Sequence, residues 1–434
     1  MTATRPSGIA WIGNIPADWD MNKIKYISTL KGRIGWQGLT SDEYTDEGAY
    51  LITGTDFDNG GINWETCVHV PMKRWEEAKD IQIGNGDLLI TKDGTVGKVA
   101  IVNGLNSPCS LNSGVLRIST ASGYDRKFLY WVLQSEVFWT WFSIKNAGNS
   151  TILHLYQGDF AEFNYAIPPL PEQQAIAAFL DDRCGQIDSI VTDLERQVEI
   201  LRQYKKALIT ETVTKGLDKA APMKDSGIDW IGEMPRHWNA KRLRYVCRLK
   251  TGTTPSENEG INIDEMGLNW FTPSDFSPSL TLATSEKYVS PEAIRRFKIT
   301  PYPAGSVLLV AIGATVGKIG YCEVPAYSNQ QITALMPYAI RGKYLMYFLH
   351  SKTDYIKDNA LYTTLPIINN TYLSDIFVCV PSDTEQVDII EFLDRKCAET
   401  DDLITEKQKA AETMRQYKKS LIYEYVTGKK RVAG

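Results

Sequence analysis

Residues 171–184 read PEQQAIAAFLDDRC, and residues 384–397 read TEQVDIIEFLDRKC, 213 positions later. The same offset relates RQYKKALITE, which begins at Arg202, to RQYKKSLIYE, which begins at Arg415. Both copies lie in stretches with no internal proline, almost no glycine and alternating charges. Such stretches are typical of long helices. The sequence therefore predicts one long helix over 171–214 and a second over 384–427.

Two further matches extend the repeat toward the N-terminal side of each helix. SGIAWIGNIPADW at 7–19 returns as SGIDWIGEMPRHW at 226–238, and LLITKDGTVGKV at 88–99 returns as LLVAIGATVGKI at 308–319. Matches that recur in one order at a nearly constant spacing indicate an internal repeat. The chain is therefore predicted to contain two copies of one unit of about 215 residues, with a pseudo-two-fold relation.

Composition places the chain among ordinary globular proteins. Of its 434 residues 43% are hydrophobic and 23% charged, and the net charge is −5. These values exclude a disordered or fibrous chain and a uniformly cationic surface. No apolar run approaches the roughly 18 residues of a spanning helix, and the start lacks the features of a signal peptide. The seven cysteines form no C-x-x-C pair, so we expect reduced thiols, a cytoplasmic location and no membrane partner.

A segment of different composition precedes each predicted helix. Residues 20–165 and 239–378 are rich in glycine, threonine, asparagine, aromatic and β-branched residues. They predict short strands with a few helices, including helices over 129–142 and 344–356. The predicted fold class is α+β, with two mixed, strand-rich globular domains joined by two long antiparallel helices that form a coiled-coil spacer. The predicted boundaries are 1–165 for the first domain, 166–216 for the first long helix, 217–378 for a linker and the second domain, and 379–434 for the second long helix and a basic tail.

Each predicted helix carries a seam of residues that step by four and three positions. In the first helix they are Leu180, Cys184, Ile187, Val191, Leu194, Val198, Leu201, Lys205 and Leu208. In the second they are Leu393, Cys397, Thr400, Ile404, Lys407, Ala411, Met414, Lys418 and Leu421. This spacing is typical of a coiled coil, and polar seam residues such as Lys205 and Lys418 fix its register. Ordinary helices packed on the sheets are the alternative. The residues predicted for the coiled coil and for partner binding are Phe179, Leu180, Ile187, Leu194, Leu201, Tyr204, Phe392, Leu393, Ile404, Met414, Tyr417 and Leu421.

Motifs for catalysis are missing from the sequence. Residues 312–318 read IGATVGK, which has three residues between its glycines where a P-loop needs four, and Ile319 replaces the magnesium-binding serine or threonine. No H-E-x-x-H motif is present, and the four histidines occupy unequal positions in the two copies. We therefore predict a non-catalytic chain without a metal or cofactor. An enzyme with unusual motifs and a coiled-coil adaptor with two protein-binding domains are the rival interpretations.

Basic residues recur in equivalent positions of the two copies. The segment 23–26, KIKY, corresponds to 242–245, RLRY, and Lys31 corresponds to Lys250. On a strand, alternation would place the cations on one face, where they could contact a phosphate backbone. A solvated strand face explains the same pattern.

A second pair of motifs lies between apolar segments. Residues 95–98 and 315–318 both read TVGK, which predicts a hairpin turn with glycine at an unusual backbone angle. Threonine, lysine and backbone N–H groups suit a phosphate, although the turn could serve folding alone. The following LNS at 111–113 and SNQQ at 328–331 offer amides that could bind an adenine edge or only form turns. The predicted DNA-binding residues are Lys23, Lys25, Lys31, Arg33, Lys92, Thr95, Gly97, Lys98, Asn112, Arg242, Arg244, Lys250, Thr315, Gly317, Lys318, Asn329, Gln330 and Gln331.

The whole arrangement resembles the specificity subunit of type I restriction–modification systems. The resemblance rests on the tandem repeat, on Pro-Leu-Pro-Glu-Gln-Gln at 169–174 with Phe-Leu-Asp at 179–181, and on the two TVGK turns. One departure is 380–386, VPSDTEQ, which lacks the double proline of the first copy. The entry into the second helix is therefore expected to differ.

The resemblance implies a DNA-targeting role without catalysis. Each globular domain would be a target-recognition domain for one half of a bipartite site in double-stranded DNA, and the helices would fix the gap. Two modification subunits, which bind S-adenosylmethionine and methylate adenine at N6, would dock on the helices and the tryptophan-containing segments. Restriction subunits, which translocate and cleave DNA, would join this complex.

Overall fold

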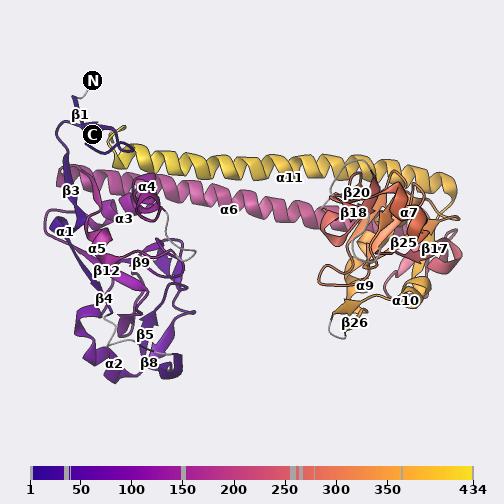
Figure 1. Ribbon diagram of the computed structural model, residues 1–434, viewed down its shortest axis with the longest axis horizontal. Helices are drawn as coiled ribbons and strands as arrows, with labels where there is room; N and C mark the ends of the chain where they lie inside the picture. The colour runs from indigo at the N-terminus through magenta and orange to yellow at the C-terminus, as the bar shows by residue number, and fades with distance from the viewer. Residues whose placement is uncertain are drawn as a thin grey trace. The chain divides into compact units, whose positions relative to one another are not determined.

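The computed structural model describes residues 3–33, 39, 41–147, 153–254, 261–262, 267–277, 279–362 and 365–432, and Figure 1 shows its helices and strands. The chain divides into two compact units. Unit 1 comprises Met1–Glu195 and Lys409–Gly434, and unit 2 comprises Arg196–Gln408. Each unit therefore holds one strand-rich domain, one part of the first long helix and one part of the second.

Two small sheets form the domain of unit 1. The larger is antiparallel, in the order β10 (Val99–Ile101), β9 (Leu88–Thr91), β12 (Val115–Thr120) and β4 (Ser28–Gly32). The smaller has the order β11 (Cys109–Leu111), β5 (Ala49–Ile52) and β8 (Val68–Val70), with β11 parallel to β5. Leu88 and Ile90 of β9 pack in the helix-covered core, whereas Leu89 packs toward the smaller sheet. Because successive side chains of a strand point to opposite faces, β9 contributes residues to two different hydrophobic cores.

Unit 2 repeats this topology with one extra strand in each sheet. Its larger sheet has the order β17 (Cys247–Thr251), β25 (Ile332–Pro337), β22 (Val307–Val310), β23 (Ile319–Cys322) and β20 (Thr281–Leu282). Its smaller sheets join β18 (Ile261–Asn262), β21 (Tyr288–Val289), β19 (Leu268–Phe271) and β24 (Tyr327–Ser328), with β19 parallel to β24. The predicted internal repeat is therefore confirmed at the level of strand order.

Short strand pairs close each domain and connect it to the helices. The pair β3 (Asp20–Lys23) and β13 (Asn164–Ile167) in unit 1 corresponds to β16 (Asn239–Arg242) and β28 (Phe377–Val380) in unit 2. The hairpin β1 (Thr4–Pro6) and β2 (Asn14–Pro16) corresponds to β14 (Met223–Asp225) and β15 (Glu233–Pro235). The remaining pairs are β6 (Phe57–Asp58) with β7 (Gly61–Ile62), and β26 (Leu361–Tyr362) with β27 (Pro366–Ile367).

Short helices cover the sheets, and two of our helix predictions need correction. The predicted helix over 129–142 is two helices, α3 (Arg126–Gln134) and α4 (Glu136–Lys145), because the Ser135 side chain caps a new helix by accepting from the N–H of Val137. The predicted helix over 344–356 is likewise α8 (Gly342–Ser351) and α9 (Thr353–Asp358), separated at Lys352. The other short helices are α1 (Ile24–Ile27), α2 (Met72–Glu77), α5 (Gln157–Ala161), α7 (Pro291–Phe297) and α10 (Asn370–Asp375). Single 3-10 turns lie at Ser41–Glu43, Lys79–Ile81, Leu243–Tyr245 and Pro273–Asp275.

The two predicted long helices are present and run antiparallel. They are α6 (Leu170–Lys215) and α11 (Asp383–Val426), which lie side by side in each unit (Figure 1). In unit 1, the ring of Phe179 packs at a tilt against that of Tyr425 with ring centroids 4.4 Å apart, and the Asp188 carboxylate binds Lys418. Residue numbers therefore rise along one helix as they fall along the other. Every predicted seam residue is buried or half-buried, which confirms the seam.

The two seam lysines form equivalent ion pairs across the helix pair. Lys418 Nζ lies 2.6 Å from an Asp188 oxygen in unit 1, and Lys205 Nζ lies 2.6 Å from an Asp401 oxygen in unit 2. The lysine side chains are 24% and 18% exposed, whereas the aspartates lie at the solvent edge. A shift of one residue along either helix would separate a partly buried cation from its partner. These pairs therefore fix the antiparallel register.

A tryptophan from each repeated N-terminal segment joins the ends of the two helices. Trp19 is fully buried, and its indole Nε1 donates to Glu172 Oε2 at the start of α6, over 3.1 Å. In unit 2, Trp238 Nε1 donates to Glu385 Oε1 at the start of α11, over 3.0 Å. Burial raises the pKa of Glu385, but the hydrogen bonds from Trp238, His237 and Ser382 outweigh burial and bring it down to about 2. We call each tryptophan–glutamate pair a helix clamp.

The tryptophan of each clamp also packs against a glycine that follows the other long helix. Gly428, after α11, has φ +69°, and a Cβ there would lie 2.3 Å from Pro16 Cδ and 3.3 Å from Trp19 Cη2. Gly216, after α6, has φ +74°, and a Cβ there would lie 3.1 Å from Trp238 Cζ2. Only glycine allows both the left-handed angle and the close approach. In unit 1 the basic tail closes this site, because Arg431 binds both Asp18 and Glu172.

Two further side chains of the repeated motif connect each helix to its domain. The buried Gln173 accepts from the N–H of Asp125 over 2.7 Å and donates to the Pro168 carbonyl over 2.8 Å. Gln386 makes the same two bonds, to the N–H of Arg341 and the carbonyl of Pro381, at 2.8 and 3.1 Å. Asp181 accepts from Trp131 and Lys127 of α3, and Asp394 accepts from Tyr347 and Lys343 of α8. The motif therefore holds each domain to the start of its helix.

We predict that Gln173→Leu lowers the free energy of unfolding of unit 1 by about 3 kcal/mol, because the Asp125 N–H and the Pro168 carbonyl lose their partner in a buried site. Gln174→Leu is the matched control, since Gln174 is the exposed neighbour in the same motif. Urea titration, with unfolding of each unit monitored by hydrogen exchange, would measure the free energy of unfolding of unit 1 in both variants. An equal loss in the two variants would contradict the role of Gln173.

Candidate nucleic-acid interface

Three loops meet at one edge of the domain in unit 1. They span 53–56 after β5, 92–98 between β9 and β10, and 112–114 between β11 and β12. Thr95 Oγ1 donates to the Gly54 carbonyl over 3.2 Å, the Lys92 N–H donates to the Gly114 carbonyl over 2.8 Å, and the Asn112 N–H donates to the Ile52 carbonyl over 2.9 Å. Direct hydrogen bonds therefore hold the three loops together.

The equivalent loops of unit 2 are also joined by direct hydrogen bonds, although the bond to the first loop comes from a lysine instead of a threonine. They span 272–276, 311–318 and 329–331. Lys318 Nζ donates to the Phe276 carbonyl over 3.1 Å, the Ala311 N–H donates to the Gln331 carbonyl over 2.7 Å, and the Asn329 N–H donates to the Phe271 carbonyl over 3.1 Å. We call the joined loops of each unit its loop frame.

The first loop of each frame carries a threonine–aspartate clasp that our sequence analysis missed. The N–H and Oγ1 of Thr53 donate to Asp56 Oδ2 over 2.7 and 2.9 Å, and those of Thr272 donate to Asp275 Oδ2 over 2.6 and 2.8 Å. The signal was present as ITGTDF at 52–57 and FTPSDF at 271–276. The clasp fixes the loop by hydrogen bonds within the loop itself.

The predicted TVGK hairpin turns are confirmed. Gly97 and Gly317 have φ +84° and +85°, and each lies between two antiparallel strands. A Cβ on Gly97 would lie 2.4 Å from Trp139 Cη2, whereas a Cβ on Gly317 would lie 2.8 Å from Lys357 Cε. The turn thus packs on an aromatic ring in unit 1 and on a lysine stem in unit 2. Identical turns are placed in different chemical surroundings.

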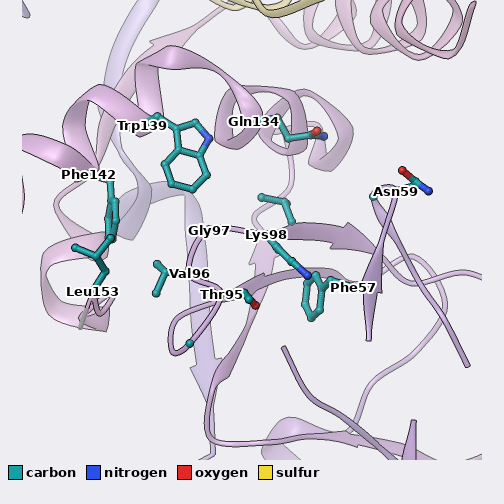
Figure 2. Close-up of a pocket in the computed structure, with 13 residues that line it drawn as sticks. Phe57, Asn59, Thr95, Val96, Gly97, Lys98, Gln134, Trp139, Phe142 and Leu153 are labelled. Carbon is teal, nitrogen blue, oxygen red and sulfur yellow. The ribbon is translucent and has the colours of Figure 1, made fainter. Parts of the chain in front are cut away.

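A cavity of about 610 Å³ lies beside the turn in unit 1 (Figure 2). Figure 2 shows the Trp139 ring facing the turn of Val96 and Gly97, with Phe142 and Leu153 to one side and Phe57 and Lys98 to the other. Among the described residues, Lys98 Nζ and Gln134 Nε2 have no hydrogen-bond partner. The cavity therefore combines apolar and aromatic walls with a few N–H groups, a composition that suits a planar or methyl-bearing group.

Unit 2 holds a polar cleft of about 440 Å³ that lies beside the first and third loops of its frame rather than beside the TVGK turn. Its lining residues are Thr254, Trp270, Thr272, Pro273, Ser274, Lys287, Asn329, Gln330 and Gln331. The cleft is therefore lined by three of the predicted DNA-binding residues, Asn329, Gln330 and Gln331. Gln330 and Gln331 correspond in sequence to Ser113 and Gly114 of unit 1, so the two frames carry different side chains at these positions.

Both predicted asparagines hold turns in their frames. Asn112 Oδ1 accepts from the N–H of Gly114 over 3.0 Å, and Asn329 Oδ1 accepts from the N–H of Gln331 over 3.1 Å. This geometry is an Asx turn. The folding role that we left open for these residues is therefore present, and their carbonyl oxygens are engaged within the chain.

The predicted basic face on a strand is corrected by the structure. Residues 24–27 form the helical turn α1 and residues 243–245 a 3-10 turn, because the buried pairs Ile24 with Ile27 and Leu243 with Val246 are spaced three apart. Lys23 and Lys25 both bind Glu162, and Arg242 and Arg244 both bind Asp375. Hydrogen bonds from Lys23 and then Lys25 lower the pKa of Glu162 to about 2. In each unit a carboxylate therefore partly neutralises the cation pair.

The remaining predicted cations differ in position. Arg33 is buried and donates to the Leu111 carbonyl over 2.8 Å, which places it inside unit 1. Lys31 lies 3.7 Å from Asp80, and Lys250 donates to the Thr300 carbonyl over 2.9 Å while burial lowers its pKa. Lys92 lies in the loop frame of unit 1 and Lys318 in that of unit 2. Their contact with DNA stays a prediction.

All seven cysteines are free and buried, and burial raises the pKa of Cys67 to about 12, far from a reactive thiolate. No cluster of three metal-ligating side chains occurs within the described part of the chain. No described helix is long and apolar enough to cross a membrane.

Comparison with known proteins assigns the family. The sequence profile of the "Type I restriction modification DNA specificity domain" matches residues 16–201 and 235–413, which is most of the chain. The chain belongs to the type I restriction–modification specificity family. The MjaVIII specificity subunit of Methanocaldococcus jannaschii is 25% identical, over 96% of this chain and 94% of that protein. The EcoBI specificity subunit of Escherichia coli is 23% identical, over 83% and 75% of the two chains.

Solved structures support the same fold. A chain from a study of complex assembly and conformational transition of the type I R-M system superposes with a TM-score of 0.75, at 17% identity and over 96% of this chain and 99% of that chain. The HsdS subunit from Thermoanaerobacter tengcongensis gives a TM-score of 0.54 at 16% identity, over 96% and 98% of the chains. The resemblance seen in the sequence is therefore confirmed. The chain is a specificity subunit, a targeting component of its system rather than an enzyme.

Proposed function

We propose that this specificity subunit recognises an asymmetric DNA site in two parts, one part for each unit. The supporting observation is that the two loop frames share their threonine–aspartate clasps and Asx turns but carry different side chains at equivalent positions. Trp139 lies beside the turn of Gly97 and Lys357 beside that of Gly317, while Gln330 and Gln331 of unit 2 replace a serine and a glycine of unit 1. Net charge differs too, at −4 for residues 20–165 (13 basic, 17 acidic) and +3 for residues 239–378 (14 basic, 11 acidic). Recognition domains with different side chains at the DNA-contacting positions select different base sequences. The site is therefore expected to be asymmetric.

Sequence information in this proposal comes from the loop frames rather than from the paired cations. Base edges are read by hydrogen bonds and apolar contacts, whereas lysine and arginine on the backbone position a protein without reading sequence. Lys23 with Lys25, and Arg242 with Arg244, already share a carboxylate in each unit. Their contribution would be confined to phosphate contacts that salt weakens.

We expect the complex of this chain with its modification subunits to methylate adenine only within one asymmetric motif of two short blocks separated by a fixed gap. Single-molecule sequencing of genomic DNA from cells that express the chain and its modification subunit would reveal the motif. A host that expresses the modification subunit alone is the control. Methylation without a motif, or within one uninterrupted block, would contradict the proposal.

We further propose that the helix pair binds two modification subunits through one apolar edge. Ile190 and Tyr417 in unit 1 are 44% and 53% exposed, and Leu403 and Tyr204 in unit 2 are 46% and 51% exposed. Each of the four residues directly precedes a seam residue of its helix. In an antiparallel pair such positions lie along one edge. The Asp188–Lys418 and Asp401–Lys205 ion pairs bring the members of each pair together.

Exposed apolar side chains at equivalent positions indicate a protein interface that is used once in each unit. The S-adenosylmethionine site would belong to the modification subunits, and this chain would need no cofactor. Restriction subunits would associate with the assembled complex. The excess of acidic residues on both long helices also favours a protein partner over DNA along this surface.

We predict that Ile190→Asp and Leu403→Asp each remove one modification subunit from the complex, and that the double variant removes both, because each buries an unpaired charge in one interface. Ile200→Asp is the matched control, since Ile200 is 53% exposed but lies two positions after the seam residue Val198. Light scattering of the purified complexes would give their stoichiometry. Loss of a subunit in the Ile200 variant alone would place the interface elsewhere.

A further inference from the structure

The polar cleft in unit 2 has side-chain amides whose orientation the structure fixes. The N–H of Gln331 donates to Asn329 Oδ1 over 3.1 Å, so the oxygen of the Asn329 amide faces this N–H. The other end of that amide, Nδ2, then donates to Gln331 Oε1 over 2.9 Å. A backbone donor therefore determines the orientation of both side-chain amides. Of the polar atoms in these two side-chain amides, Gln331 Nε2 is the one that takes no part in either hydrogen bond.

The groups left over in the cleft are hydrogen-bond donors. Gln331 Nε2 has no partner among the described residues and lies next to Gly313, where a Cβ would approach it to 3.3 Å. Gln330 Oε1 accepts from Thr254 Oγ1, which leaves Gln330 Nε2. Lys287 is exposed, and its ammonium has no ion-pair partner in the described part of the chain. The three residues that carry these two amide N–H groups and one ammonium line the same cleft.

The hydroxyl groups of the cleft are engaged with one another. Thr272 Oγ1 donates to Asp275, and the single hydroxyl proton of Ser274 is shared between Thr272 Oγ1 at 2.8 Å and Glu286 at 3.3 Å. The carboxylate of Asp275 also accepts from the N–H groups of Thr272 and Glu286. A ligand that offers a donor would therefore meet other donors, whereas a ligand that offers two acceptors would satisfy them.

We infer that the cleft of unit 2 is a guanine-reading site, in which Gln331 Nε2, with Gln330 Nε2 and Lys287, donates to the O6 and N7 acceptors of a guanine in the major groove. Guanine presents two adjacent acceptors there, whereas adenine presents an acceptor beside an amino donor. This inference differs from our expectation that Gln330 and Gln331 suit adenine. The inference rests on the proposed function, since it names the base that one unit reads.

A backbone phosphate is also an acceptor, but the lining of the cleft favours a base. Two of the three donors are neutral amides, and the indole of Trp270 forms an apolar wall that is 5% exposed. Phosphates are bound mainly by arginine, lysine and backbone N–H groups. A single lysine with two amides and an indole therefore suits the polar edge and flat face of a base better than it suits a phosphate.

The test uses the full complex with its modification subunits and a duplex that carries the methylated motif. Each guanine of the motif is replaced in turn by 7-deazaguanine, which lacks N7, or by 6-thioguanine, which has a weaker acceptor at position 6. In the wild-type complex we expect one guanine of one block to lose roughly fivefold to tenfold in affinity with at least one analogue. Equilibrium binding at fixed salt measures the loss.

The decisive variant is Gln331→Glu, which keeps the oxygen that Asn329 binds and replaces the outward N–H group with an acceptor. In this variant the same analogue should change affinity no further, because the contact that it removes is already absent. Gln203→Glu, with the same change of charge on the exposed surface of α6, should keep the wild-type sensitivity.

Three outcomes would overturn the inference. Loss of affinity with 7-deazaadenine in place of the guanine analogues would make the base an adenine. Coupling of Gln331→Glu to a neutral methylphosphonate linkage, rather than to a base analogue, would make the ligand a phosphate. Unchanged guanine sensitivity in Gln331→Glu would remove Gln331 from the contact. In all three the two-part motif stands, whereas a complex without any sequence-specific binding would overturn the proposed function itself.

Discussion

Trp19 and Trp238 each join the end of one long helix to the start of the other, and the remaining structure depends on these two helix clamps. A single helix with an apolar stripe is not stable in water, so α6 and α11 must be held together at both of their paired ends. The indole donates to a glutamate at the start of one helix, and its ring lies over the glycine that ends the other. In unit 1 the clamp is built from both chain ends, with Arg431 as an additional tie.

The clamps matter for function because the same motif positions the DNA-reading domains. One residue after the clamping glutamate, Gln173 or Gln386 binds the backbone at the start of α3 or α8. Those helices pack on the larger sheet, whose hairpin carries the TVGK turn. Each long helix is therefore connected to its loop frame through one short helix and one sheet, by buried contacts. A rigid support of this kind allows the exposed lining of the loops to vary without loss of the fold.

The long helices could be predicted to within about one residue at each end, because proline and glycine are nearly absent from them and the seam steps by four and three. The ion pairs of the seam lysines with Asp188 and Asp401 could not be predicted, because the sequence does not show which residue of the other helix faces each lysine. The helix break at Ser135 followed a capping signal that we did not use, a serine directly before Glu136.

The candidate site was predicted less completely than the fold. The TVGK turns were recognised because a glycine between two apolar strands has few other uses. The strand assigned to 23–26 was wrong because alternation of charge was read where Ile24 and Ile27, three apart, decide the local structure. The contrast between Trp139 and Lys357 beside the two turns arises from tertiary packing of α4 and α9, far along the chain, so no local pattern contains it.

The central claim is that two modules of one design read two different half-sites. Its most direct test is a chain in which residues 20–167 replace residues 239–380, so that both modules are those of unit 1. Sequencing of adenine methylation in cells with this chain and its modification subunit should give a palindromic motif, with the unit 1 block present twice in inverted orientation. A motif that keeps the original second block would contradict the account.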